Sequence, residues 1–120
     1  MQQNLEISPQ DFLKLYKDDF KNLILIDIRT LAEHSQGYIA GSHHLLMDDL
    51  TVAKIETLIN QKSAVKPVVV LYCRSGVRSL NYITSLKAYE KEELEDIGAK
   101  ILSLDGGINA MPGEILENKN

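Results

Sequence analysis

Short apolar runs alternate with amphipathic segments along the whole chain. Three of the runs, Leu23–Ile28, Val68–Tyr72 and Lys100–Leu104, are short and rich in branched apolar residues. Nearly continuous runs of this length are typical of strands that are buried on both faces of a parallel sheet. Strands that alternate with helices predict an α/β fold, with a central, mainly parallel sheet and helices on both of its faces.

The segments between these runs are predicted to be mainly helical. Ser8 is a candidate N-cap, because proline follows it and an acidic residue stands three positions later. Gly98 is expected to end the last long helix, and residues 115–120 are expected to be frayed. The other expected elements are a helical turn or two over 30–36, a short strand over 42–46, a helix capped by Asp48 or Asp49, a helix from Ser79 to about Tyr89 that continues as an exposed charged surface, and a short turn that ends at Pro112.

Composition favours one globular domain over residues 1–120. The chain is 44% hydrophobic and 25% charged, which is typical of a soluble folded protein. The net charge of -4 argues against broad binding of nucleic acid, which usually needs a basic face. The apolar runs are too short to span a bilayer, so no membrane association is expected.

The chain has one cysteine, so no internal disulfide can form. The first residues, Met1 to Glu6, lack the positive start and apolar core of a signal peptide. Both observations favour a reducing cytoplasmic location.

The segment from Tyr72 to Ser79 carries the candidate chemistry. It places Cys73 directly after a buried strand and then supplies a glycine, two arginines and the start of a helix. Helix N-termini and nearby main-chain N–H groups favour negative charge, so this thiol should ionise easily. Arg74 and Arg78 are expected at the pocket mouth, where they would hold an anionic substrate. Ligands of such folds bind beyond the carboxyl ends of the strands, which is where Cys73 is expected.

These residues resemble the rhodanese-like sulfurtransferases in their single-domain form. The likeness runs from about Leu23 to Met111 and rests on three segments in the family's order. They are Leu25-Ile26-Asp27-Ile28-Arg29 with the following Glu33-His34 and 37–42, the loop Cys73–Ser79, and Leu104-Asp105-Gly106-Gly107-Ile108. The chain departs from the family pattern at Tyr38, Ala40, 43–45 and Met111, and its stretch between Tyr89 and Gly98 is longer.

The resemblance implies that Cys73 takes a sulfane sulfur from a small anionic donor such as thiosulfate and becomes a persulfide. With no second cysteine, an external acceptor must then remove the sulfur: cyanide, a thiol or a partner protein. No cofactor is implied. The scheme needs a thiol that is held as an anion and is not walled off from solvent.

The remaining loop residues have expected supporting roles. Gly76 lets the loop curl, and Ser75 and Val77 contribute backbone N–H groups. Ser79 either caps the following helix or donates to the persulfide, and capping is the favoured interpretation. In an earlier segment, Asp27 and Arg29 border the same edge of the sheet, where a structural role is favoured over a catalytic one.

A metal site is not expected at the three histidines, His34, His43 and His44. Adjacent histidines on a strand point to opposite faces, and no second cysteine is available as a ligand. The charged stretch over 90–96 is interpreted as a solvated helix face, with a docking surface as the alternative.

Two other functions remain open. Cysteine-dependent phosphatases and arsenate reductases also hold an oxyanion above a cysteine, but their signature places five residues between cysteine and arginine, whereas four separate Cys73 and Arg78. A non-catalytic binding module with the same fold is the third hypothesis, because fold alone does not establish chemistry.

Overall fold

The computed structural model describes residues 4–118, and its centre is a five-stranded parallel sheet in the order β1-β6-β5-β2-β4. The strands are β1 Glu6–Ile7, β2 Leu23–Asp27, β4 His43–His44, β5 Val68–Tyr72 and β6 Lys100–Leu104. The three apolar runs form the middle of this sheet, as predicted. β2 pairs with β5 along its whole length, from Leu23 beside Val68 to Asp27 beside Tyr72. The carboxyl ends of these two strands therefore meet at one edge.

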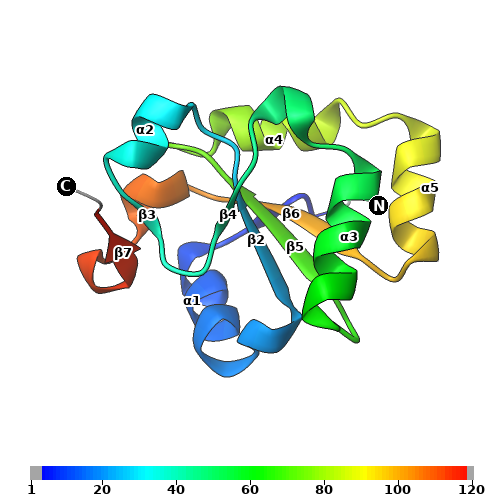
Figure 1. Cartoon of the computed structure of the whole chain (residues 1–120), viewed down its shortest axis with the longest axis horizontal. Coiled ribbons are helices and arrows are strands. Elements are labelled where there is room, and N and C mark those ends of the chain that lie inside the picture. The colour runs from blue at the N-terminus through cyan, green and yellow to red at the C-terminus, as the bar shows by residue number, and fades with distance from the viewer. Residues whose placement is uncertain (1–3, 119–120) are drawn as a thin grey trace.

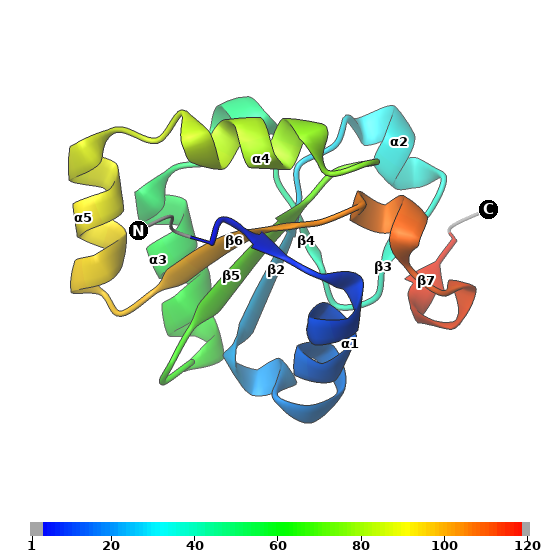
Figure 2. The same cartoon turned by 180° about the vertical axis from the view of Figure 1, so that it is seen from behind.

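Helices cover both faces of the sheet, which confirms the predicted fold class (Figures 1 and 2). One face packs against α3 Val52–Lys62, α4 Val77–Thr84 and α5 Ala88–Asp96, and the other packs against α1 Pro9–Asp18. Successive strand residues point to opposite faces, so Val69 and Leu71 enter the first core while Val70 and Tyr72 enter the second. This double burial explains why the strands are apolar without alternation.

A smaller unit lies at the edge where the strands end. It contains α2 Leu31–Ser35 and the antiparallel pair of β3 Tyr38–Ile39 with β7 Leu116–Glu117. Figure 1 shows this unit at one end of the molecule and α5 at the other. The predicted fraying is wrong for 115–117, because β7 pairs with β3 and the Ala40 N–H donates to the Ile115 carbonyl at 2.9 Å. Residues 119–120 lie outside the described part of the chain.

Of the two N-cap predictions, the one for α1 is confirmed and the one for α3 is wrong. The Ser8 hydroxyl accepts the Asp11 N–H and caps α1, as predicted. The predicted Asp48 or Asp49 cap is wrong, because both residues lie in a short 3-10 helix and α3 begins three residues later with Thr51 as its cap. The Thr51 hydroxyl reaches the Lys54 N–H at 3.2 Å, which satisfies one of the free donors of the first turn.

The predicted continuous helix after the cysteine is interrupted. α4 ends at Thr84, and α5 starts afresh at Ala88 and ends just before Gly98, the predicted stop, which has a left-handed φ of 72°. Within residues 4–118, no helix is both long enough and apolar enough to cross a membrane.

Candidate functional site

The turn between β5 and α4 places Cys73 at the carboxyl end of the central strand, as predicted. Gly76 is the N-cap residue of α4 and has a φ of 97°, a conformation that residues with a side chain rarely adopt. A Cβ atom at this position would lie 3.1 Å from both the Gly106 nitrogen and the Leu104 oxygen. The loop therefore curls at Gly76 and packs tightly against the end of β6.

The glycine pair identified in the sequence supports the cysteine loop from behind. The Ile108 N–H donates to the Cys73 carbonyl at 3.0 Å, and the Asn109 N–H donates to the Arg74 carbonyl at 3.1 Å. Gly107 has a φ of 58°, and a Cβ atom there would lie 2.5 Å from the Cys73 oxygen. The late glycine segment is thus the platform on which the loop rests.

The Cys73 sulfur lies within a group of hydrogen-bond donors. The Gly76 N–H points to Sγ at 3.2 Å, and the Ser79 Oγ lies 3.6 Å from it. Burial raises the pKa of the Cys73 thiol, but hydrogen bonds from the Ser79 main chain, the Ser79 hydroxyl and the Gly76 and Ser75 main chain outweigh it, and the net pKa lies below the usual value. The arrangement therefore favours an anionic sulfur.

This sulfur is much less accessible than the sequence led us to expect. Cys73 is only 1% exposed, and it lines neither of the two cavities described below. Cys73 packs within the apolar core on the face that α3, α4 and α5 cover. A reagent therefore reaches Sγ only when neighbouring side chains move aside.

The two arginines of the loop have different surroundings. Both guanidinium ends of Arg78 bind the Glu33 carboxylate, at 2.8 Å each. This hydrogen bonding lowers the pKa of Glu33 to about 2. Arg74 is exposed and borders a cavity of about 470 Å³, and among residues 4–118 it has no ion-pair partner. Arg74 therefore borders a cavity that Cys73 itself does not line, whereas Arg78 is held by α2.

Asp27 and Arg29 form a buried ion pair beside the loop. Arg29 donates to both carboxylate oxygens, at 2.9 and 2.8 Å, and also to the Gly37 carbonyl at 2.6 Å. His34 Nδ1 lies 2.9 Å from the same carboxylate. Burial raises the pKa of Asp27, but the hydrogen bonds from Arg29 and His34 outweigh it and the net pKa is lowered. These contacts tie β2 to α2 and fit the structural role that the sequence favoured.

The histidines pack as a stack. The His34 ring lies between the rings of Tyr38 and His44, with centroid distances of 4.4 and 4.2 Å. His44 Nε2 is 2.8 Å from the Arg29 oxygen. In the described part of the chain, no group of three or more histidine, cysteine or acidic residues is arranged to hold a metal ion. His34 and His44 each contact the Asp27–Arg29 segment and so help to hold it in place.

The favoured interpretation of Ser79 as a helix cap is wrong. Gly76 occupies the cap position, so Ser79 is the third residue of α4 and its side chain is completely buried. Its Oγ approaches Sγ of Cys73 and lies 2.6 Å from the Ser103 Oγ. The other interpretation, donation by this hydroxyl to a persulfide, stays a prediction, and the hydroxyl lies close enough to Sγ for it. Val77 is 61% exposed and makes no contact with Sγ among the described interactions.

Sequence reasoning missed Ser103 and the pairing role of Glu33. A serine within the apolar run of β6 was the available signal, because a buried hydroxyl requires a hydrogen-bond partner. For Glu33, no local pattern indicates that α4 will bring an arginine to it, since 45 residues separate the two.

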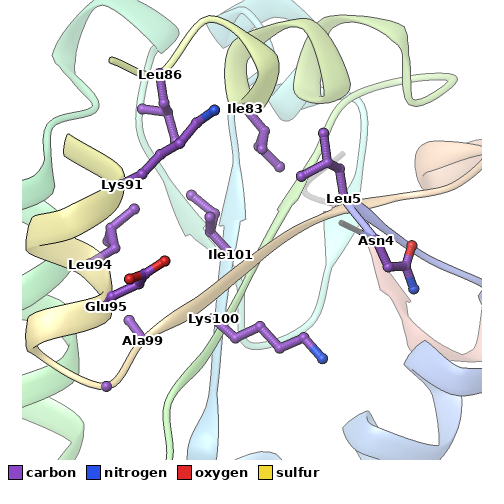
Figure 3. A pocket seen from close by; sticks show the side chains of 11 residues that line it. Asn4, Leu5, Ile83, Leu86, Lys91, Leu94, Glu95, Ala99, Lys100 and Ile101 are labelled. Atoms are coloured by element: carbon purple, nitrogen blue, oxygen red, sulfur yellow. The ribbon is translucent and has the colours of Figure 1, made fainter. Parts of the chain in front are cut away.

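A second cavity has a different lining from the one beside the loop (Figure 3). It measures about 530 Å³ and lies between α4, α5, β6 and the segment before β1. Its walls are mostly apolar, and none of the predicted site residues lines it. The predicted solvated face of α5 holds for Glu92 and Glu93, but Leu94 of the same helix is 2% exposed and packs in the core.

Comparisons with known proteins agree with this geometry. A family model described as "Rhodanese-like domain" matches residues 8–112. The Bacillus subtilis (strain 168) protein named "Putative sulfurtransferase YtwF" is 34% identical over 94 residues, which is 78% of each chain. A rhodanese-like domain protein from Staphylococcus aureus is 27% identical with a TM-score of 0.61, covering 96% of this chain and 98% of its own. An As-Sb reductase from Leishmania major, 17% identical with a TM-score of 0.70 over 98% of this chain and 88% of its own, shares the fold.

Proposed function

The chain belongs to the rhodanese-like domain family, and from this premise we propose that it is a sulfurtransferase that carries sulfane sulfur on Cys73. One observation carries the proposal: the chain's single cysteine directly follows the central strand, and its sulfur lies among N–H and hydroxyl donors. Such donors stabilise a thiolate and, after reaction, an anionic persulfide. Cys73 also packs in the apolar core on one face of the sheet, where a purely structural cysteine would need none of these donors.

The proposed reaction has two steps. In the first, the Cys73 thiolate attacks the outer sulfur of thiosulfate, the sulfur–sulfur bond of the donor breaks, and its electron pair leaves with sulfite. In the second, an external nucleophile attacks the outer sulfur of the persulfide, and the electron pair returns to Sγ as the thiolate. The acceptor is cyanide in an assay, and a small thiol or a partner protein in a reducing cytoplasm.

Arg74 is proposed to attract the anionic donor. Its exposed guanidinium stands at the cavity beside the loop, while Glu33 already occupies Arg78. Because Cys73 is almost covered, a small anion is favoured over a bulky one. The main chain of Ser75 and Gly76, with Ser79, then holds the reacting sulfur.

Mass spectrometry of the intact protein tests the proposal. After reduction and incubation with thiosulfate, the wild type is expected to gain the mass of one sulfur atom, and cyanide is expected to remove it as thiocyanate. Cys73→Ser and wild type alkylated beforehand are the controls and should gain nothing. A wild type that stays unmodified with thiosulfate and with a panel of persulfide donors contradicts the proposal.

Phosphatase or arsenate reductase activity is the alternative, and the shared fold with the Leishmania enzyme makes it worth testing. Hydrolysis of an aryl phosphate, or thiol-dependent reduction of arsenate, that disappears in Cys73→Ser would favour it. The binding-module hypothesis is favoured instead if Cys73 resists small alkylating reagents near neutral pH.

A further inference from the structure

Two buried hydroxyl groups lie in series behind the Cys73 sulfur. The Ser79 Oγ is 3.6 Å from Sγ, and the Ser103 Oγ is 2.6 Å from the Ser79 Oγ. Both serines are 0% exposed, and they come from different elements, α4 and β6. Buried hydroxyls are unfavourable unless they are hydrogen-bonded, so the distances restrict where each proton goes.

The pair of hydroxyls can donate a proton to one of two acceptors outside the pair, the Cys73 sulfur or the Gly76 carbonyl. Each hydroxyl donates one proton, and the short contact between the two oxygens uses one of them. The other goes either to Sγ or to the Gly76 carbonyl, which lies 3.3 Å from the Ser79 Oγ and 3.4 Å from the Ser103 Oγ. That carbonyl also accepts the Leu80 N–H at 3.2 Å, so it keeps a partner without either hydroxyl.

We propose that Ser103 is a positioning residue for the reactive sulfur, and that both hydroxyls reverse direction with the charge on that sulfur. Beside a thiolate, Ser103 donates to Ser79 and Ser79 donates to Sγ. Beside a thiol, the S–H donates to Ser79, Ser79 donates to Ser103, and Ser103 donates to the Gly76 carbonyl. Only O–H bonds rotate, and the thiol proton itself passes to a base in solution. The proposal rests on Cys73 being the sulfur carrier.

The two arrangements depend on Ser103 to different degrees. In the thiol arrangement, Ser79 can donate to the Gly76 carbonyl when the Ser103 hydroxyl is missing, so every group keeps a partner. In the thiolate arrangement, the donation from Ser103 polarises the Ser79 hydroxyl toward the anion, and no other described group replaces it. Loss of the Ser103 hydroxyl therefore disfavours the thiolate. Arg78 is a charged group that interacts electrostatically with Cys73. Its hydrogen bonds go to Glu33 and involve neither serine, so the substitution leaves this interaction unchanged.

A double-mutant cycle with Ser103→Ala and Ser79→Ala tests the proposal, with the pH profile of Cys73 alkylation by iodoacetamide as the readout. Below the pKa of the thiol, Ser103→Ala is expected to react about two to three times more slowly than wild type, and Ser79→Ala about ten times more slowly, because the second loses a direct hydrogen bond to the charge. At high pH, all rates should converge. In the Ser79→Ala background, Ser103→Ala should have no further effect.

Ser85→Ala is the matched control, because Ser85 lies at the exposed end of α4. Its alkylation profile should equal that of wild type.

A second pair of variants isolates the hydroxyl from its buried volume. Ser103→Thr and Ser103→Val have nearly the same shape, so Ser103→Thr should follow the wild-type profile and Ser103→Val the Ser103→Ala profile. The proposal is overturned if Ser103→Thr and Ser103→Val give the same alkylation profile. It is also overturned if Ser103→Ala slows alkylation equally in the wild type and in the Ser79→Ala background. The readout needs no sulfur donor, so a protein that shows these shifts but forms no persulfide contradicts the proposed function alone.

Discussion

Gly107 shows how strongly a single backbone position controls the candidate site. The N–H groups of the next two residues, Ile108 and Asn109, support the cysteine loop, and main-chain atoms of that loop leave no room for a side chain at Gly107. An alanine Cβ would meet the Cys73 oxygen at 2.5 Å and main-chain atoms of Arg74 at 2.6 Å. Main-chain atoms on both sides are held by hydrogen bonds, so the contact cannot be relieved by turning a flexible side chain.

We therefore expect Gly107→Ala to lower the free energy of unfolding by at least about 2 kcal/mol and to displace the loop. Urea denaturation measures the first effect, and the rate of sulfur transfer at a temperature where the variant is folded measures the second. Gly113→Ala, where a Cβ meets nothing within 4 Å, should stay within about 0.5 kcal/mol of wild type. Equal stability of the two variants would show that the platform is not tightly packed.

At the level of elements, α2 and α4 are joined across the site by the Glu33–Arg78 pair. The contact is bidentate but partly exposed, with 28% and 37% of the two side chains accessible, so solvent weakens it. The pKa of Glu33 falls from 4.5 to about 2 on folding. A lowered carboxylate pKa stabilises the folded state above pH 4.5, and this stabilisation is lost as the pH falls toward 2.

Glu33→Gln should accordingly reduce the free energy of unfolding at pH 7 by about 0.5 to 1 kcal/mol. The difference from wild type should shrink at pH 3, because the Glu33 carboxyl is then mostly protonated in the unfolded state and folding must release that proton to form the ion pair. Glu92→Gln on the exposed face of α5 is the control and should differ from wild type by less than about 0.5 kcal/mol at both pH values. A Glu33→Gln deficit that is equal at pH 7 and pH 3 would rule out the charge as its cause.

The elements also show which parts of the structure the sequence could predict. β2 and β5 were predicted correctly because both of their faces are buried, which leaves a continuous apolar run in the sequence. β7 was missed because its pairing with β3 joins residues 38–39 to 116–117, and no local pattern indicates that contact. Ser79 was misinterpreted because α4 begins at Val77, where the left-handed Gly76 takes the place of a side-chain cap. Long-range contacts therefore account for the missed strand, whereas local backbone geometry accounts for the misplaced helix starts.

For the molecule as a whole, the parallel order of the sheet assembles the site. The neighbouring strands β2 and β5 run in the same direction, so Asp27 and Cys73 reach the same edge and α2 and α4 can meet above it. The chain supplies one sulfur to this edge, and that cysteine is free. No second thiol in the chain can resolve a persulfide.

Steady-state kinetics should therefore be ping-pong, because the donor must leave its sulfur on the protein before an external acceptor removes it. Plots of reciprocal rate against reciprocal thiosulfate concentration, each at a fixed cyanide concentration, are expected to be parallel lines. Lines that converge would indicate a ternary complex and would replace the covalent scheme. Oxidation of Cys73 beyond the sulfenic state should abolish activity, and added thiol should not restore it.

The pH dependence of Cys73 alkylation is the most direct measure of whether the site holds its sulfur as an anion. With iodoacetamide, a small reagent suited to a thiol that is 1% exposed, the account predicts a rate profile in wild type with a midpoint below about 8.5, the value for a free cysteine. Cys73→Ser should incorporate no label. A midpoint at or above that value would contradict the account, because burial would then outweigh the donors that surround the sulfur.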